Sequence, residues 1–144
     1  MKLFYRAFMA ILFVNLIFVG AANAQKLKGE WKLVQAKQDG KAVVFKDEIK
    51  TTAVFGKENR MSGNAGCNRY STTYTLENTK KIRFEPIIST KMACLDDDFM
   101  KQESTFFSVM EKVEKYKIKG NHLTFFDDSK QNVLKFARVY KRNS

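Results

Sequence analysis

From Gly29 onward, most of the chain alternates apolar and polar residues with a period of two. Strands that bury one face and expose the other show this pattern. The only proline, Pro86, ends one such segment, because proline cannot donate a hydrogen bond to a strand ladder. A Gly120-Asn121 pair between two others predicts a tight hairpin. The apolar positions of the predicted strands are Trp31 and Leu33, Ala53 and Phe55, Tyr70 to Leu76, Ile82 and Phe84, Tyr116 and Ile118, Leu123 and Phe125, and Leu134, Phe136 and Tyr140.

One segment, residues 95–113, departs from this alternation. Its apolar residues recur at helical spacing and predict one amphipathic helix; they are Phe99, Phe106, Met110 and Val113. Three consecutive aspartates, Asp96 to Asp98, stand at its start. We interpret them as a helix cap, because carboxylates there accept from free backbone N–H groups and suit the helix dipole. A calcium loop of the EF-hand type would need a spacing of ligands that is absent here.

The predicted fold class is mainly β, an antiparallel, partly closed barrel-like sheet of about seven or eight strands with one amphipathic helix. The helix can cover one face of an open sheet, or it can plug the open end of a partly closed barrel. The number of strands favours the barrel, since closing a sheet removes its exposed edges. Nine of the 13 phenylalanines lie in residues 25–144, and they favour an interior filled by side chains, with a small cavity as the open alternative.

Residues 1–24 have the three parts of an export signal. Basic residues stand within the first six positions, residues 7–20 form an apolar run, and Ala22-Asn23-Ala24 matches the pattern that signal peptidase reads. The run is shorter than the roughly 20 residues that a membrane-spanning helix needs. The sequence therefore predicts cleavage that leaves Gln25 first, and a protein that does not span the membrane. No cysteine stands near that position, so a lipid anchor is not expected there.

Residues 25–144 are long enough for one domain that buries roughly two-thirds of its unfolded surface. Without Lys2 and Arg6, 24 of the 26 basic residues remain against 15 acidic ones, a formal charge of +9. This charge permits contact with phosphate-rich lipids, acidic glycans or nucleic acid. However, the basic residues alternate with acidic ones and form no run of five, which favours scattered, solubilising lysines.

Two short motifs contain the only two cysteines. The first is Ser62-Gly63-Asn64-Ala65-Gly66-Cys67-Asn68-Arg69-Tyr70, and the second is Ser89-Thr90-Lys91-Met92-Ala93-Cys94. Together with the opening Gly29-Glu30-Trp31-Lys32-Leu33, the predicted helix and the final Leu134-Lys135-Phe136-Ala137-Arg138 strand, they resemble the META domain of HslJ-like heat-shock and envelope proteins. The resemblance spans nearly all of the predicted domain at residues 25–144.

The resemblance implies a cracked antiparallel barrel with a helix packed against it, related in shape to small lipocalin-like domains. It also implies export and a loose association with stress, antibiotic tolerance or virulence, and no established enzymatic activity accompanies it. The family motif falls on Gly66, Asn68, Thr90 and Met92. Asn68 is expected to hydrogen-bond loop backbone, since asparagine readily satisfies turn amides.

Cys67 and Cys94 can form a disulfide, a metal pair or a redox centre. Zinc needs about four ligands, and the chain offers these two cysteines and one histidine, His122. A thioredoxin-like centre needs the Cys-x-x-Cys spacing, which is absent. An oxidising compartment after export favours a structural disulfide, with free buried thiols as the alternative that stays open.

No metal, cofactor or catalytic residue is predicted. His122 has no recognisable nucleophile motif beside it and is expected to face solvent. Asp127 and Asp128 are interpreted as a turn between strands rather than as a glycosidase carboxylate pair. Basic and aromatic residues alternate at Arg69-Tyr70 and Lys115-Tyr116-Lys117, but the period of two explains them without nucleic acid.

The sequence leads to a non-catalytic protein of the cell envelope, periplasmic or extracellular, with a binding or stress-response role. It is expected to be a monomer whose partner is an unknown envelope protein. The alternative is a carrier that holds a small apolar ligand in a lipocalin-like barrel. An enzyme is the weakest hypothesis, since no nucleophile–base or metal constellation is recognisable.

Overall fold

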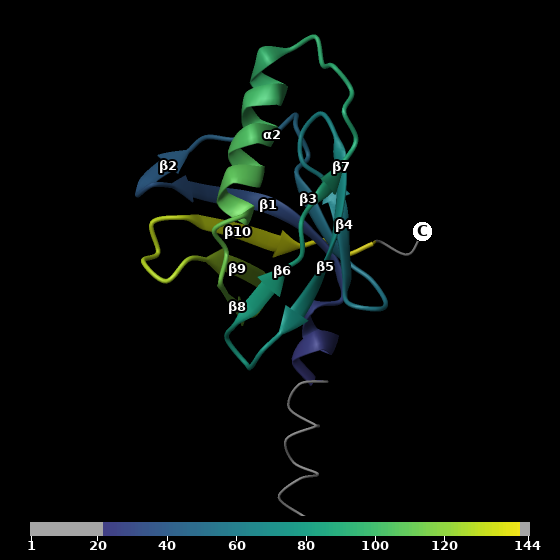
Figure 1. The fold of residues 1–144 in the computed structure, drawn as a ribbon, viewed down its shortest axis with the longest axis vertical. Coiled ribbons are helices and arrows are strands. Elements are labelled where there is room, and N and C mark those ends of the chain that lie inside the picture. Colours follow the sequence, from purple (N-terminus) through teal and green to yellow (C-terminus); the bar gives the residue numbers. More distant parts are fainter. Residues whose placement is uncertain (1–21, 142–144) are drawn as a thin grey trace, which may run out of the picture.

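The structure, a computed structural model, describes residues 22–141. Most of the predicted signal peptide, residues 1–21, lies outside the described residues. The remainder forms a mainly antiparallel β fold with two helices (Figure 1). Residues 22–27 are helical and precede the first strand. The strands are β1 (Gly29–Gln38), β2 (Lys41–Val43), β3 (Thr52–Phe55), β4 (Arg60–Asn64), β5 (Arg69–Leu76), β6 (Ile82–Phe84), β7 (Ile88–Ser89), β8 (Lys115–Lys119), β9 (His122–Phe126) and β10 (Val133–Arg138).

Eight of these strands form a sheet that nearly closes into a barrel. They follow one another in the order β6-β5-β4-β3-β1-β10-β9-β8, while β2 pairs with β1 and β7 pairs with β5. At one end of β6 and β8 the sheet is almost closed, because the Ile82 N–H donates to the Glu114 carbonyl at 3.0 Å and the Tyr116 N–H donates to the Lys80 carbonyl at 2.8 Å. One seam therefore remains between β6 and β8. The predicted partly closed barrel is confirmed.

The long helix α2 (Asp97–Met110) packs across one end of this barrel (Figure 1). Asp96 caps it, since its carboxylate accepts from the Asp98 N–H at 2.8 Å, as the aspartate run predicts. Lys46 donates to the Asp98 carboxylate, and this contact holds the pKa of Asp98 below its usual range. The helix is shorter than the predicted segment 95–113, although Val113 still packs in the core after the helix ends.

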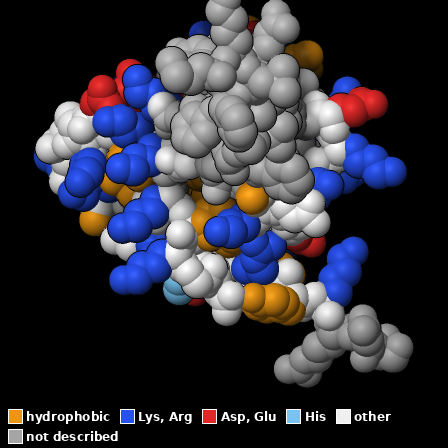
Figure 2. Space-filling view, turned by 90° about the horizontal axis from the view of Figure 1, so that it is seen from below, with side chains coloured by type: hydrophobic (Ala, Val, Ile, Leu, Met, Phe, Trp, Pro, Cys, Tyr) orange, Lys and Arg blue, Asp and Glu red, His pale blue; other side chains and the backbone are white. Residues whose placement is uncertain are grey.

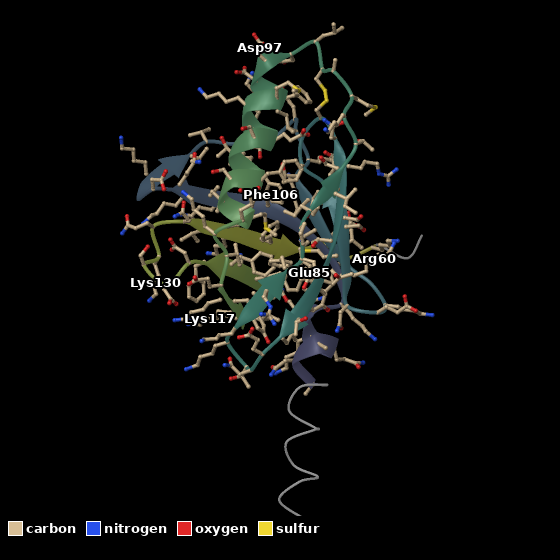
Figure 3. The ribbon with its side chains drawn as sticks, viewed as in Figure 1. Arg60, Glu85, Asp97, Phe106, Lys117 and Lys130 are labelled. Carbon is tan, nitrogen blue, oxygen red and sulfur yellow. A yellow bond between two sulfur atoms is a disulfide. The ribbon has the colours of Figure 1, made fainter. Side chains whose placement is uncertain are left out.

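The barrel interior is filled by aromatic and aliphatic side chains. Phe125 lies at the centre, with its ring centroid 5.3 Å from Phe84, 5.6 Å from Phe136 and 6.2 Å from Phe55. Phe106 extends from α2 into the same core (Figure 3). Phenylalanine side chains therefore fill the barrel interior, as the sequence favoured. The largest fully buried side chains are Trp31, Phe106, Phe125, Phe136, Leu27, Met61, Ile82, Met110, Leu123 and Leu134.

Trp31 fixes the segment just before β1 to the barrel. Its indole N–H donates to the Leu27 carbonyl at 2.8 Å, and the Arg138 guanidinium lies 4.0 Å from its ring centre. Arg138 also donates to the carbonyls of Lys26 and Lys28 at 2.6 and 2.8 Å. The segment just after the predicted cleavage site is therefore part of the domain.

Two predictions about strands need correction. The closing strand ends at Arg138, and Tyr140 lies beyond it with 65% of its surface exposed, its hydroxyl donating to the Asn121 side chain. The Val139 N–H still donates to the Glu30 carbonyl of β1 at 2.8 Å, but the ladder ends there and Tyr140 is not part of it. In addition, the sequence pattern missed β2, β4 and β7, because short strands with few apolar residues carry little periodic signal. Within residues 22–141, no helix is long and apolar enough to cross a membrane.

Candidate functional site

The two cysteine motifs meet at the N-terminal half of α2. The first motif forms β4, a tight turn and the start of β5, and the second follows β7. Cys67 and Cys94 are joined by a disulfide, with their Cα atoms 6.1 Å apart. Gly66 has a φ of +146°, and a Cβ atom there would lie 3.2 Å from the Phe99 carbonyl oxygen of α2. The glycine of the motif is therefore required by backbone conformation and by close approach to the helix.

Asn68 is the residue that connects all three segments. Its side-chain oxygen accepts from the Thr90 hydroxyl at 2.9 Å and from the Met92 N–H at 2.8 Å. Its side-chain amide donates to one oxygen of Glu103 at 2.8 Å, and its backbone N–H donates to the other at 2.5 Å. The four predicted motif residues are thus brought together, and three of them share one hydrogen-bond network. The bond from the Met92 N–H is of the kind expected for Asn68, an asparagine that satisfies loop backbone.

Glu103 is the member of this network that the sequence prediction missed. Only 8% of its surface is exposed, and both carboxylate oxygens accept from Asn68. A buried carboxylate needs such donors, because burial without hydrogen bonds or a countercharge is costly. A sequence signal existed, since Glu103 lies four residues after Phe99 and three before Phe106, on the apolar side of the predicted helix.

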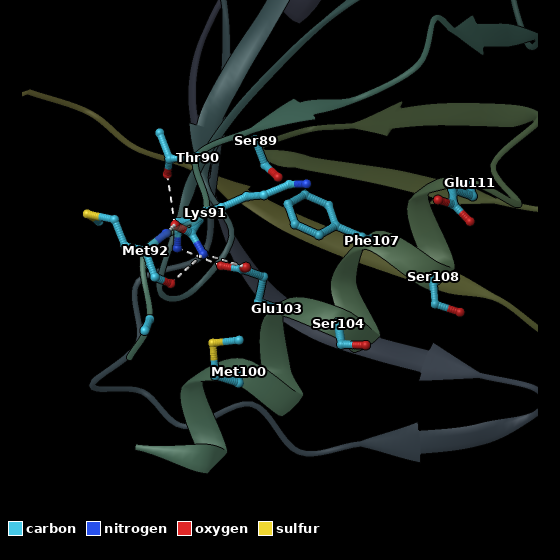
Figure 4. A pocket seen from close by; sticks show the side chains of 12 residues that line it. Ser89, Thr90, Lys91, Met92, Met100, Glu103, Ser104, Phe107, Ser108 and Glu111 are labelled. Carbon is cyan, nitrogen blue, oxygen red and sulfur yellow. Dashed lines mark hydrogen bonds between the residues drawn. The ribbon is translucent and has the colours of Figure 1, made fainter. Parts of the chain in front are cut away.

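A groove of about 690 Å³ runs between this network and α2 (Figure 4). One wall carries Thr90 and Met92, and the other carries Met100, Glu103 and Phe107. A second groove of about 590 Å³ continues it toward β6. The two share three lining residues, Ser89, Phe107 and Glu111, so they form one depression along α2. We call this depression the α2 groove.

The strand β7 presents a free edge to the α2 groove. The Thr90 N–H donates to the Arg69 carbonyl at 3.0 Å, and Ser89 is the next residue on the strand, opposite Tyr70. In an antiparallel ladder, hydrogen-bonded and non-hydrogen-bonded pairs alternate, so the Ser89 N–H and C=O point away from β5. No second strand pairs with β7 in the part of the chain that the structure describes. The groove therefore contains backbone groups that an added strand can use.

The polar side chains of the α2 groove do not form a catalytic arrangement. Glu103 is occupied by Asn68, and Ser104 and Ser108 lie on the helix without a histidine among the lining residues. His122 is exposed at the start of β9 and lines neither part of the groove. Among residues 22–141, no group of three histidine, cysteine, aspartate or glutamate side chains could hold a metal ion.

The fold and both motifs agree with one protein family. The profile of the META domain matches residues 24–140, which is more than half of the chain. The chain belongs to the META domain family. The resemblance carried by the two cysteine motifs is therefore confirmed at the level of the META domain. No match to the chain is found among curated proteins.

Solved structures show the same fold at low sequence identity. An NMR structure of a protein from Burkholderia xenovorans is 23% identical, with a TM-score of 0.66, and the match covers 83% of this chain and 88% of that one. A crystal structure of a DUF4847 family protein from Bacteroides vulgatus is 13% identical, with a TM-score of 0.60 and coverage of 81% and 96%. At these identities the likeness shows the fold alone and says nothing about activity.

Proposed function

We propose that the protein is an exported, non-catalytic, HslJ-like META-domain protein of the cell envelope. It binds an extended segment of another envelope protein, which adds to β7 as a strand inside the α2 groove. The observation that carries this proposal is the free edge of β7. An edge strand beside a groove offers main-chain hydrogen bonds for affinity and side-chain pockets for specificity.

The side chains around this edge support a protein partner. Met92 and Met100 stand on opposite walls of the groove with 58% and 43% of their surfaces exposed. Ile88 is also exposed, at 73%. Methionine side chains are flexible and polarisable, so they adapt to apolar side chains of varied shape. The polar lining from Lys91 and Glu111 lets the groove stay hydrated when it is empty.

The position of the predicted cleavage site supports export. Cleavage after Ala24 leaves every strand in place, together with Leu27 and its hydrogen bond to Trp31. A disulfide between Cys67 and Cys94 suits an oxidising compartment outside the cytoplasm. N-terminal sequencing of protein from its own host tests this part. A first residue of Gln25 supports export with cleavage, and an intact Met1 contradicts it.

The carrier hypothesis has less support. A lipocalin-like carrier keeps a cavity in its barrel, whereas here the interior positions hold Trp31, Phe125 and Phe136, all fully buried. Organic extraction and mass spectrometry of protein from its own host test this alternative. A stoichiometric apolar compound would favour the carrier over the strand-binding proposal.

A selection from a library of random extended peptides tests the binding proposal. Ser89→Pro removes an amide N–H that points into the groove and is not used by the β5 ladder, so the selected peptides should lose about tenfold or more in affinity through the lost hydrogen bond. Met92→Glu should weaken them similarly by placing a charge in the apolar lining. The matched control is Val44→Glu, which changes an exposed apolar residue outside the α2 groove.

Isotope-edited infrared or NMR spectra of the bound peptide give the second readout. An extended peptide with cross-strand contacts to Ile88 and Ser89 supports the proposal. Peptides that bind the control and the two groove variants equally well would overturn it, as would a peptide that binds as a helix.

A further inference from the structure

The outer face of the strands β1, β10, β9 and β8 is unusually basic. The register places Lys119 opposite His122, His122 opposite Ala137, and Ala137 opposite Lys32. The next row along the same face runs from Lys117 through Thr124 and Lys135 to Gln35. Side chains of one face recur at every second residue, so both rows point away from the core. The core-facing rows between them are the buried Tyr116, Leu123, Phe125, Leu134, Phe136, Trp31 and Leu33 and the half-buried Ile118.

Five lysines on this face lack a countercharge. We define them as the basic face, and they are Lys32, Lys37, Lys117, Lys119 and Lys135. The ion pairs of residues 22–141 involve other basic groups, and none of the five has a carboxylate oxygen within 4.0 Å. Of the acidic residues beside these strands, Asp128 pairs with Lys115 and Asp39 pairs with Lys112, whereas Glu30 at the start of β1 has no ion pair among the described residues. Positive charge therefore accumulates over four adjacent strands.

The space-filling view agrees with this register. Lys and Arg side chains crowd the left part of the surface in Figure 2, on the side where Figure 1 places β8, β9 and β10. Lys117 projects outward there, away from the barrel (Figure 3). Acidic side chains lie mainly at the margin of that view. The lysines come from three separate parts of the sequence, so their clustering is a product of the fold.

The dimensions of the basic face identify the kind of ligand. Three strand spacings make it roughly 14 Å wide, and four residues along a strand make it roughly 13 Å long. Lysines spread over such an area do not converge on one phosphate. They match a flat array of many single negative charges instead. We propose that the basic face docks the domain on the surface of a membrane that contains anionic phospholipids.

Other features of the face favour a bilayer over nucleic acid. Single-stranded nucleic acid is bound by exposed aromatic platforms in a groove, whereas the outward positions here hold one aromatic residue, the half-buried Phe126. Phe126 and Val133 face each other across β9 and β10 next to the lysines. Lysine side chains place their apolar stems over such residues and keep their charges in the headgroup region. Each lysine near an anionic membrane surface contributes separately to binding.

Co-sedimentation of the full chain with lipid vesicles tests this proposal. The vesicles contain phosphatidylcholine alone or phosphatidylcholine with about 30% phosphatidylglycerol, a mixture that gives an anionic surface. Binding to the neutral vesicles measures any contribution of the apolar run at residues 7–20. We expect binding to increase with phosphatidylglycerol and to fall strongly as salt rises from about 50 to 300 mM, because salt screens exposed charges.

Matched variants test whether the basic face itself binds the anionic vesicles. The triple variant Lys117→Gln, Lys119→Gln and Lys135→Gln should lower the partition coefficient on anionic vesicles about 100-fold. The control neutralises Lys50, Lys57 and Lys101, which are exposed and lie on none of the four strands. Both triple variants change the net charge by the same amount. Thermal melts of all three proteins show whether each variant is folded, and Lys117→Gln with Lys119→Gln replaces the triple variant if Lys135→Gln unfolds it.

Three results would overturn the proposal. Equal losses in the two triple variants would mean that net charge alone attracts the protein. Tight binding to soluble polyphosphate or single-stranded nucleic acid, without binding to anionic vesicles, would assign the face to a different polyanion. Binding to neutral and anionic vesicles that is equal and independent of salt would mean that the face has no part in it.

Discussion

The two halves of α2 attach to the barrel by different means. The C-terminal half contributes Phe106, Val109 and Met110, all essentially without exposed surface, to the aromatic core. The N-terminal half contributes Gln102 and Glu103, whose side chains accept from the Lys46 N–H and from Asn68. One half is therefore fixed by nonpolar burial, and the other by hydrogen bonds to two irregular segments, one of which carries Cys67 of the disulfide.

The C-terminal half of α2 therefore contributes mainly to the stability of the domain, and the N-terminal half mainly to the geometry of the α2 groove. Burial of large apolar side chains gives most of the folding free energy of a small domain. Hydrogen bonds contribute less each, but they have defined directions, so they set the positions of the loop and β7 beside the helix. We therefore expect changes in the C-terminal half to affect global unfolding, and changes around Asn68 to open the α2 groove locally.

The largest effect should come from the nonpolar half. Phe106→Ala leaves a cavity under the helix and removes the contact with Tyr70, whose ring centroid is 5.3 Å away. We expect a loss of about 4 kcal/mol in the free energy of unfolding, measured by denaturant titration. Met100→Ala on the exposed side of the same helix is the control, with an expected change within about 0.5 kcal/mol. Similar losses for both would contradict a core role for this half.

The disulfide should have the next largest effect. Replacing Cys67 and Cys94 by serine releases a cross-link between residues 27 apart in sequence. In the chain-entropy model this lowers the free energy of unfolding by about 3.5 kcal/mol. The far-ultraviolet signature of the strands should remain, since both cysteines lie outside the barrel interior. Non-reducing peptide mapping of protein from its own host checks the bond itself, and two free thiols there would refute it.

A smaller but more local effect is expected at Asn68. Asn68→Ala removes the amide that donates to one oxygen of the buried Glu103 carboxylate, and it removes the acceptor of Thr90 and Met92, at a cost of about 2 to 3 kcal/mol. The backbone N–H of residue 68 still donates to the other Glu103 oxygen. Hydrogen exchange should become faster mainly in residues 65–69 and 90–94. Asn132→Ala is a matched control, because Asn132 is also buried and hydrogen-bonded, but it contacts Asp127 near β10. If both variants gave the same exchange pattern, the local role of Asn68 would be wrong.

The smallest effect concerns Tyr70, which lies between the two halves. Its hydroxyl donates to the Thr52 carbonyl at 2.8 Å, and burial raises the pKa of this phenol far above its usual value. The folded state therefore keeps the proton that the unfolded state loses above pH 10, so stability is complete below about pH 10 and falls as the pH rises further. Tyr70→Phe should cost about 1 kcal/mol at neutral pH and make the alkaline decline shallower. Urea titrations at several pH values measure both changes, and an unchanged alkaline slope would contradict the assignment.

Much of the fold was predictable because it depends on regular alternation. The positions Trp31, Phe125 and Phe136 point inward in the structure, as a period of two requires. The aspartate cap and the Gly120-Asn121 hairpin were also predicted correctly, since both depend on residues adjacent in sequence. The short strand β7 was not, because two residues have no period. The period-two alternation therefore could not predict the free edge of β7, on which the proposed binding depends.

The sequence by itself determined which side chains of the longer strands face the core, where the helix starts, and that the two cysteine motifs belong to a META domain. Those features depend on local spacing and on residue types within a few positions of one another. Only the tertiary structure decided that Asn68, Met92 and Glu103 meet, and that five lysines from β1, β8 and β10 form one basic face. Strand order and register set these distances, because they bring together residues that are far apart along the chain.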